Sequence, residues 1–165
     1  MTAMIKSDPF YNPLDIVESV IMDRDWSFDR PDDAELIAEV AGQWCKYNVW
    51  FDWQEEHGTL SLTCSLDTKF SKSLLLKMYA LLGIVNEKLW LGHFTVSAED
   101  ATVSFRHSLL LRDGAGISAE QLRDLLDMAV EECERFYPAY QSVVWGGKSP
   151  EQAVEMALFE TVAEA

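Results

Sequence analysis

The stretch from Asn86 to Leu111 constrains the fold more than any other part of this chain; its sequence is NEKLWLGHFTVSAEDATVSFRHSLLL. An apolar helical segment ends within residues 86–90, and Gly92 follows as a hinge. Two runs of alternating apolar and polar residues come next, joined by the tight turn Ser97–Asp100. Alternation around a short turn is typical of an antiparallel hairpin. We therefore expect a helix that leads directly into two strands of a sheet.

A three-stranded meander is predicted between residues 36 and 66. If Gly42-Gln43 forms a two-residue turn, the apolar residues of segments 36–40 and 47–53 share one face, and Glu39 lies opposite Lys46. A four-residue loop, Glu55–Gly58, then places the apolar residues of segment 60–66 on that same face. Two independent turns thus agree on which face of the sheet is buried.

Helices are expected around these strands. The longest apolar helical stretch, Phe70–Trp90, is hydrophobic on most sides, so we expect the sheet and another helix or a second subunit to cover it. The remaining predicted elements are a helix from Pro13 to Asp23 capped by Asn12, a short edge strand Trp26–Asp29, a helix from Ser118 to Phe136 interrupted by Pro138, a short helix Ala139–Trp145, and a final helix from Ser149-Pro150 to Thr161.

The predicted fold class is therefore α+β, an antiparallel sheet packed by helices. Its order is helix, three or four strands, helix, two strands, then two or three helices. We expect a loose leader over residues 1–11 and a single domain over residues 12–165.

The net charge of the chain limits the classes of binding partner that we expect. Acidic residues outnumber basic ones by 28 to 13, and the formal net charge is −15. Nucleic-acid backbones and anionic membranes attract positive patches, so we expect neither as a partner. A basic protein partner fits the charge, although an acidic surface also simply favours solubility.

The cysteines and the hydropathy of the sequence indicate the cellular compartment of the protein. Cys45, Cys64 and Cys133 are widely spaced without a CxxC pair, so we expect reduced core cysteines. The first residues lack an apolar signal-peptide core, and no run of 18 apolar residues occurs. We expect a cytoplasmic protein.

The histidines form no catalytic or metal-binding set that the sequence supports. His57 lies in a loop tip, and His107 falls on the apolar face opposite Gly92, where room for a ring is expected. His93 lies on the polar face opposite Arg106, and this pair is a candidate anion site. The spacings match no metal-ligand or nucleophile motif, so we expect no cofactor, no metal and no enzymatic activity.

Exposed aromatic residues favour a binding role instead. Alternation places Trp50 on the polar face of the meander, and Trp26 and Phe28 lie on the expected edge strand. Aromatic side chains on a polar surface are typical of protein interfaces. The alternative is that a helix or the N-terminal segment covers them.

Several motifs resemble the YbjN-like proteins of bacteria, whose fold is similar to that of the small chaperones of type III secretion. The motifs, spread over roughly residues 14–160, are Trp26–Arg30, Trp53–Glu56, Asn86–Phe94, Phe105-Arg106, Tyr137–Tyr140 and Trp145–Lys148. The resemblance implies a chaperone-like, dimeric α+β domain with a described role in sensory transduction regulation and no catalytic residues. The secretion chaperones are acidic homodimers that wrap an extended client segment; the helical tail after Pro138 is a departure from them.

Two hypotheses follow. The first is a non-enzymatic cytoplasmic protein-binding domain, chaperone-like or regulatory, that acts as a homodimer. The second is a small-molecule or anion sensor that uses His93 and Arg106, with Lys148 as a further cation.

Overall fold

Six antiparallel strands form one sheet in the order β1-β2-β3-β4-β6-β5. The computed structural model describes residues 11–111 and 116–163. The strands are β1 (Phe28–Asp29), β2 (Glu35–Ala41), β3 (Lys46–Gln54), β4 (Thr59–Leu66), β5 (His93–Ser97) and β6 (Thr102–Leu110). The helices are α1 (Pro13–Asp23), α2 (Leu75–Asn86), α3 (Ala119–Val144) and α4 (Pro150–Ala163), with short 3-10 turns at Glu55–His57 and Lys72–Leu74. The predicted α+β class is confirmed.

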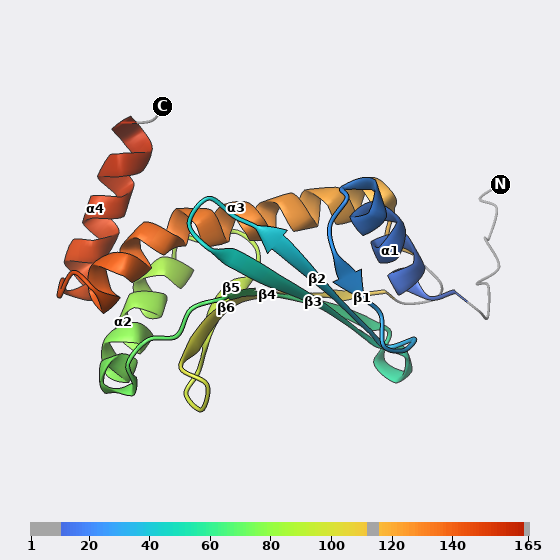
Figure 1. Cartoon of the computed structure of the whole chain (residues 1–165), viewed down its shortest axis with the longest axis horizontal. Coiled ribbons are helices and arrows are strands. Elements are labelled where there is room, and N and C mark those ends of the chain that lie inside the picture. Colours follow the sequence, from blue (N-terminus) through green and yellow to red (C-terminus); the bar gives the residue numbers. More distant parts are fainter. Residues whose placement is uncertain (1–10, 112–115, 164–165) are drawn as a thin grey trace.

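Within the residues that the structure describes, helices cover one face of the sheet and leave the other uncovered (Figure 1). α1 and α3 lie on that covered face, α2 packs beside β5, and α4 contacts α3 and α2. The core consists of alternate strand residues from the covered face together with the apolar sides of α1 and α3. We call the other side of the sheet the open face. Its residues include Ile37, Glu39, Asn48, Trp50, Asp52, Ser61, Thr63, Ser65, His93, Thr95, Ser104, Arg106, Ser108 and Leu110.

The β2–β3 hairpin has the predicted buried face but not the predicted register. Glu39 pairs with Asn48 and Ala41 with Lys46, because the loop has four residues, Gly42–Cys45, rather than a two-residue turn. The register therefore shifts by two residues, and a shift of two keeps every side chain on its face. The charge pair survives diagonally, since Lys46 Nζ lies 2.9 Å from Glu39 Oε1.

The other two predicted pairings are confirmed. Gln54 pairs with Thr59 across the Glu55–Gly58 loop, and Phe94 pairs with Phe105 in the β5–β6 hairpin. Gly58 has φ +60°, a conformation that glycine adopts without steric cost.

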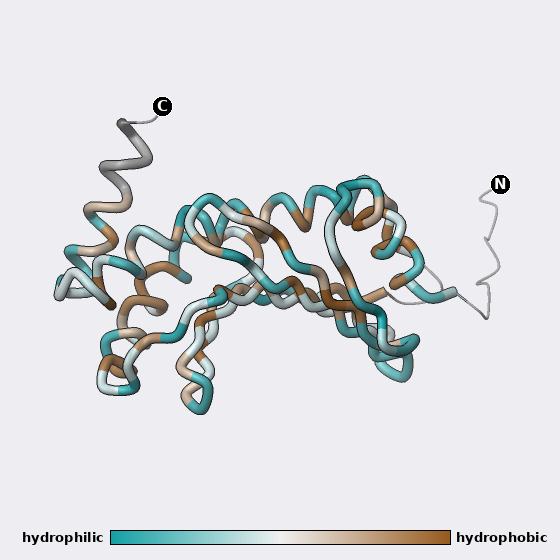
Figure 2. The backbone as a smooth tube through the Cα atoms, in the orientation of Figure 1, coloured by the Kyte–Doolittle hydropathy of each residue, from teal (hydrophilic) through white to brown (hydrophobic). Residues whose placement is uncertain are grey.

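The helical predictions needed two corrections. α2 is a 12-residue helix that ends at Asn86 rather than Trp90, and the single chain leaves part of it exposed, so cover by a second subunit stays a prediction. Leu76 and Tyr79 remain 81% and 47% exposed, and Figure 2 shows hydrophobic residues along this helix.

The longest helix is α3, with 26 residues, and it continues through Pro138 instead of ending near Phe136. Proline removes one N–H and strains the preceding turn. Here the flanking residues Phe136, Tyr137, Ala139 and Tyr140 are all buried against the core, so tertiary packing keeps the helix continuous.

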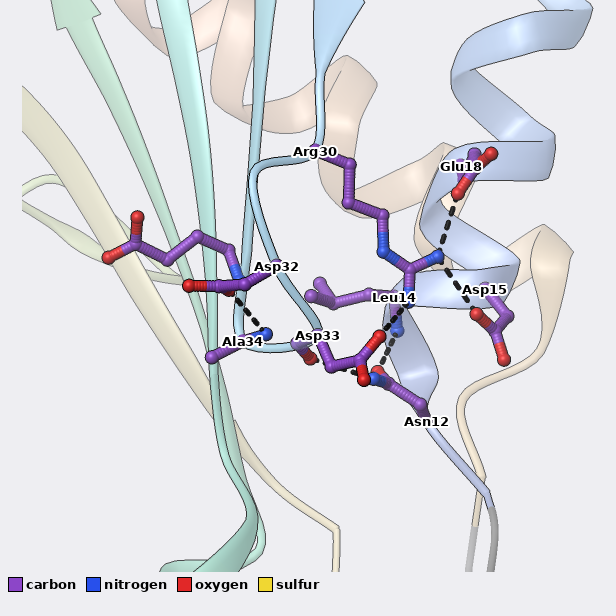
Figure 3. Close-up of polar contacts among 9 residues, drawn as sticks. Asn12, Leu14, Asp15, Glu18, Arg30, Asp32, Asp33 and Ala34 are labelled. Atoms are coloured by element: carbon purple, nitrogen blue, oxygen red, sulfur yellow. Dashed lines mark hydrogen bonds and ion pairs between the residues drawn. The ribbon is translucent and has the colours of Figure 1, made fainter.

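Arg30 fastens α1 to the β1–β2 connection (Figure 3). Its guanidinium donates to Asp15 at 2.8 Å and Glu18 at 2.7 Å on α1, and lies 3.7 Å from Asp33. The hydrogen bond to Glu18 is the main reason that the pKa of Arg30 is raised. Asn12 caps α1 as predicted, accepting from Leu14 N–H.

Candidate functional site

One row of side chains crosses all six strands on the side away from the helices. The strand register gives this row as His93, Arg106, Thr63, Trp50, Ile37 and Asp29. Neighbouring strands lie about 4.8 Å apart, so Trp50 and Arg106 stand about 10 Å from each other. The structure thus places the predicted anion pair and the predicted binding aromatic Trp50 on one surface.

Trp50 lies near the middle of this row. Its side chain is 43% exposed, and its direct neighbours are Ile37 on β2 and Thr63 on β4. Much of the surrounding surface is hydroxyl-bearing, and two serine pairs hydrogen-bond across strands, Ser61–Ser108 at 2.8 Å and Ser65–Ser104 at 2.7 Å. The open face therefore presents an isolated aromatic and apolar patch inside a polar surface.

Charge changes sign along the row. Asp29 lies at the β1 end, whereas Arg106 and His93 lie exposed at the β6–β5 end. His93 and Arg106 face each other directly across the two strands, as predicted. A bound segment with the opposite charge order would meet a complementary surface at both ends.

Trp26 and Phe28 are placed differently from Trp50. Both are half-buried and pack against the core rather than projecting from the sheet. The guanidinium of Arg24 stands 5.0 Å from the centre of the Trp26 ring, a cation–π distance. β1 covers only Phe28–Asp29, so Trp26 precedes the edge strand. Their role in binding stays a prediction, and it would depend on the part of each ring that remains accessible.

His107 is half-buried at the covered side of β6. Burial lowers its pKa, and nearby His93 lowers it further. The ring that fills the space at Gly92 is that of Phe105, not that of His107 as predicted. A Cβ at Gly92 would approach the Phe105 ring within 2.3 Å and the Arg106 carbonyl within 2.8 Å. Gly92 also has φ +67°, so this hinge requires glycine on two counts.

The three cysteines are free thiols. Cys64 and Cys133 are buried and Cys45 is half-buried. A hydrogen bond with Cys64, together with burial, raises the pKa of Cys133, and burial raises that of Cys45. Raised thiol pKa values leave little thiolate at neutral pH. Within residues 11–111 and 116–163 no group of three or more potential ligands is placed to hold a metal ion.

Two cavities lie along α3. One of about 210 Å³ lies between α2, α3 and α4 and is lined mainly by apolar residues such as Val85, Leu89 and Phe136. Another of about 350 Å³ lies between β6 and α3. Neither cavity is lined by Trp50, His93 or Arg106. These three residues therefore belong to the open surface of the sheet and not to either cavity.

Two features were missed by the sequence analysis. Ile37 extends the Trp50 patch, and alternation with buried Leu36 and Ala38 was the signal that could have identified it. Trp90 is 98% exposed in the α2–β5 connection, where the sequence suggested a helix end. The structure does not group Lys148 with the anion pair: its backbone N–H donates to the Ser142 carbonyl near the end of α3.

Comparisons with known proteins agree with this architecture. A crystal structure described as "YbjN, a putative transcription regulator from E. coli" matches with a TM-score of 0.53 and 14% identity, over 73% of this chain and 85% of that one. No curated protein matches. None of the helices in the described residues is long and apolar enough to cross a lipid bilayer. Residues 13–142 match the family model YbjN, described as "putative bacterial sensory transduction regulator", and the chain therefore belongs to the YbjN family.

Proposed function

We propose that this chain is a non-enzymatic regulatory domain of the cytoplasm that binds a protein partner through the open face of its sheet. The observation that carries the proposal is the exposed Trp50 beside Ile37 on the sheet face that none of the described helices covers. Contact surfaces of this kind concentrate binding energy in a central aromatic residue with a polar surround. The description of the family as regulators is consistent with this role.

Arg106 is the second anchor that we propose on this face. Its side chain is exposed, and a guanidinium can bind a carboxylate of a partner in bidentate geometry. Trp50 and Arg106 flank Thr63, so a single segment lying across the strands can reach both.

The test is affinity capture from the native host with purified wild-type protein, Trp50→Ala and Arg106→Ala, read by mass spectrometry. The matched control is Trp145→Ala, which removes a tryptophan that is 61% exposed at the end of α3. We expect the same partner to be lost from both open-face variants and retained by the control. Recovery of every partner with Trp50→Ala would show that the open face is not the binding surface.

We further propose that the chain is a homodimer joined through α2. The exposed residues of this helix include Leu76, Tyr79, Ala80 and Gly83, and the helix contains no carboxylate. With a net charge of −15, two copies repel least where acidic residues are absent. Small residues at the centre also allow two helices to approach closely.

Light scattering at micromolar concentration tests the dimer. We expect about twice the chain mass of 18.8 kDa for the wild type and a monomer for Leu76→Glu. Leu110→Glu, which adds the same charge at another exposed leucine, is the control. A wild-type monomer contradicts the dimer without affecting the open-face proposal.

Anion sensing by His93 and Arg106 is the second candidate, because the two side chains face each other across β5 and β6. Titration with inorganic phosphate, followed by the NMR shifts of His93, tests it. Saturable shifts that disappear in Arg106→Ala would support this candidate, and unchanged shifts would dismiss it.

A further inference from the structure

The sheet has an unpaired stretch of edge where β6 extends beyond the end of β5. β5 begins at His93, which pairs with Arg106, while β6 continues as far as Leu110. On its other side β6 remains paired with β4 as far as Leu110. Gly92, with φ +67°, turns the chain before it can continue beside β6.

The backbone direction of this stretch follows from two hydrogen bonds. Leu111 N–H donates to the Gly58 carbonyl at 2.7 Å, on the β4 side. In an antiparallel strand, successive residues direct their backbone groups to opposite sides. Ser108 and Leu110 therefore direct N–H and C=O away from β4. In the described part of the chain nothing on that side hydrogen-bonds with them.

The neighbouring edge of β5 is closed by a side chain. Asn86 Nδ2 donates to the Phe94 carbonyl at 3.1 Å, and its Oδ1 accepts from Phe94 N–H at 2.8 Å. The amide thus replaces a paired strand at that point. Unpaired edges attract other strands, and proteins commonly block them. This chain blocks the edge of β5 and leaves the edge of β6 open.

An apolar cavity lies directly below the open edge. Its volume is about 350 Å³, and it is lined by His107, Leu109 and Leu111 from the β6 side, by Leu125 and Met128 from α3, and by Leu91. A strand added at Ser108–Leu110 would direct alternate side chains toward α3 and into this cavity. The site therefore offers backbone pairing and an apolar pocket together, the two components of strand addition.

Carboxylates line the adjoining space along α3. A second cavity of about 440 Å³ shares Leu91, Asp124 and Met128 with the first. It is lined by Asp124, Asp127, Glu131 and Glu132 against the cations Lys88 and Arg135. Asp127 and Glu132 already have ion pairs, with Arg24 and Arg135. The charge that remains uncompensated is negative.

We propose that the β6 edge at Ser108–Leu110 binds an extended segment of another protein, with apolar side chains at alternate positions and flanking lysine or arginine residues. This docking site consists of the backbone edge of β6 and the cavity on the covered side of the sheet, whereas Trp50 lies two strands away on the open face. It stands whether or not the open face binds a partner.

The test uses a fluorescein-labelled peptide of about eight residues in which valine alternates with serine and lysines flank both ends, long enough to pair with the edge and reach the acidic wall. Anisotropy is measured at physiological salt, which screens unspecific attraction to the acidic protein. The same peptide with proline in place of its central valines is the ligand control. We expect saturable binding of the first peptide only.

Leu110→Pro is the decisive variant, and Leu110→Ala is its control. Leu110 is 59% exposed, and its N–H faces away from β4, so proline removes the docking donor without breaking the β4–β6 ladder. We expect at least about a tenfold loss of affinity for Leu110→Pro and a change below about twofold for Leu110→Ala. Circular dichroism verifies that both variants are folded.

Charge variants test the site without touching the strand. Asp124→Lys should weaken binding about fivefold, whereas Glu99→Lys, the same charge change in the turn between β5 and β6 at the opposite end of β6, should have little effect. Trp50→Ala should leave peptide binding unchanged, which separates this proposal from the open-face proposal.

Three results would overturn the proposal: no binding of the peptide to the wild type, equal affinity of Leu110→Pro and Leu110→Ala, or equal effects of Asp124→Lys and Glu99→Lys. A fourth would reassign the edge to a second copy of this chain. In that case light scattering would give a dimer for the wild type and Leu110→Ala, and a monomer for Leu110→Pro.

Discussion

The covered and open faces of the sheet are built from alternate residues of the same strands, yet they serve different ends. On β3, Phe51 is completely buried, while its neighbour Trp50 is 43% exposed. The covered face is apolar and stabilises the fold, and the open face is mostly polar with one aromatic residue that packing does not require. Where a large aromatic residue contributes little to the core, binding is the more direct explanation of its presence.

The largest expected effect compares these two neighbours. Phe51→Ala leaves a cavity in the core, so we expect it to lower the free energy of unfolding by about 3–5 kcal/mol. Trp50→Ala removes only cross-strand contacts and should cost about 1 kcal/mol or less. Urea denaturation of both variants measures the difference. Similar losses for the two would mean that Trp50 is a structural residue, and the open-face proposal would lose its main support.

A second comparison concerns two glycines. Gly92→Ala places a Cβ within 2.3 Å of the Phe105 ring at φ +67°, so we expect a loss of more than about 1 kcal/mol. Gly83→Ala meets nothing within 4 Å inside α2 and should stabilise by about 0.5–1 kcal/mol. We therefore predict that Gly92→Ala lowers the free energy of unfolding and that Gly83→Ala raises it.

Thermal unfolding in a Leu76→Glu background checks both glycine variants, because that background removes any contribution from α2 pairing. Stabilisation by Gly92→Ala would show that the hinge tolerates a side chain. It would also mean that the end of β5 is not fixed by glycine geometry.

Much of this division into faces was predictable from the sequence. Strict alternation over segments 36–40, 47–53 and 60–66 identified the buried residues, because the side-chain period of a strand is two. The hairpin register was not predictable to the residue. Gly42-Gln43 fits a two-residue turn locally, but the tertiary structure uses the four-residue loop Gly42–Cys45. Both registers bury the same face, so alternation cannot distinguish them.

At Pro138 and in α2, the structure differs from what the local sequence predicts, because tertiary packing determines the outcome. Proline predicts a helix end, yet α3 continues because residues on both sides of Pro138 are buried against the core. The apolar surface of α2 predicted cover on most sides, and the single chain leaves Leu76 exposed. For the candidate site, alternation placed Trp50, His93 and Arg106 on polar faces. Only the order β4-β6-β5 put them in one row, and that order depends on long-range pairing.

The edges of the sheet give a third, smaller contrast. Asn86→Ala removes two hydrogen bonds with the Phe94 backbone and opens the edge of β5, so we expect a loss of about 1–2 kcal/mol. Asn86→Asp keeps the acceptor for Phe94 N–H and loses only the donor, so it should cost less. Hydrogen exchange of the Phe94 amide, together with urea midpoints, measures both effects. Equal protection in Asn86→Ala and wild type would mean that the side chain does not close this edge.

The smallest expected effect concerns pH at the end of the covered face. Burial lowers the pKa of His107, with a further contribution from His93. The folded-state pKa therefore lies below the unfolded value of about 6.5. Between these two values the unfolded chain binds more protons, so stability rises with pH in that window and falls as the pH drops from about 7.5 toward 5.5. His107→Gln should remove this part of the pH dependence, whereas His57→Gln removes an exposed loop histidine and serves as the control. Urea midpoints at the two pH values give the comparison. An unchanged difference between them in His107→Gln would place this histidine in solvent rather than at the edge of the core, and the covered face would then end before residue 107.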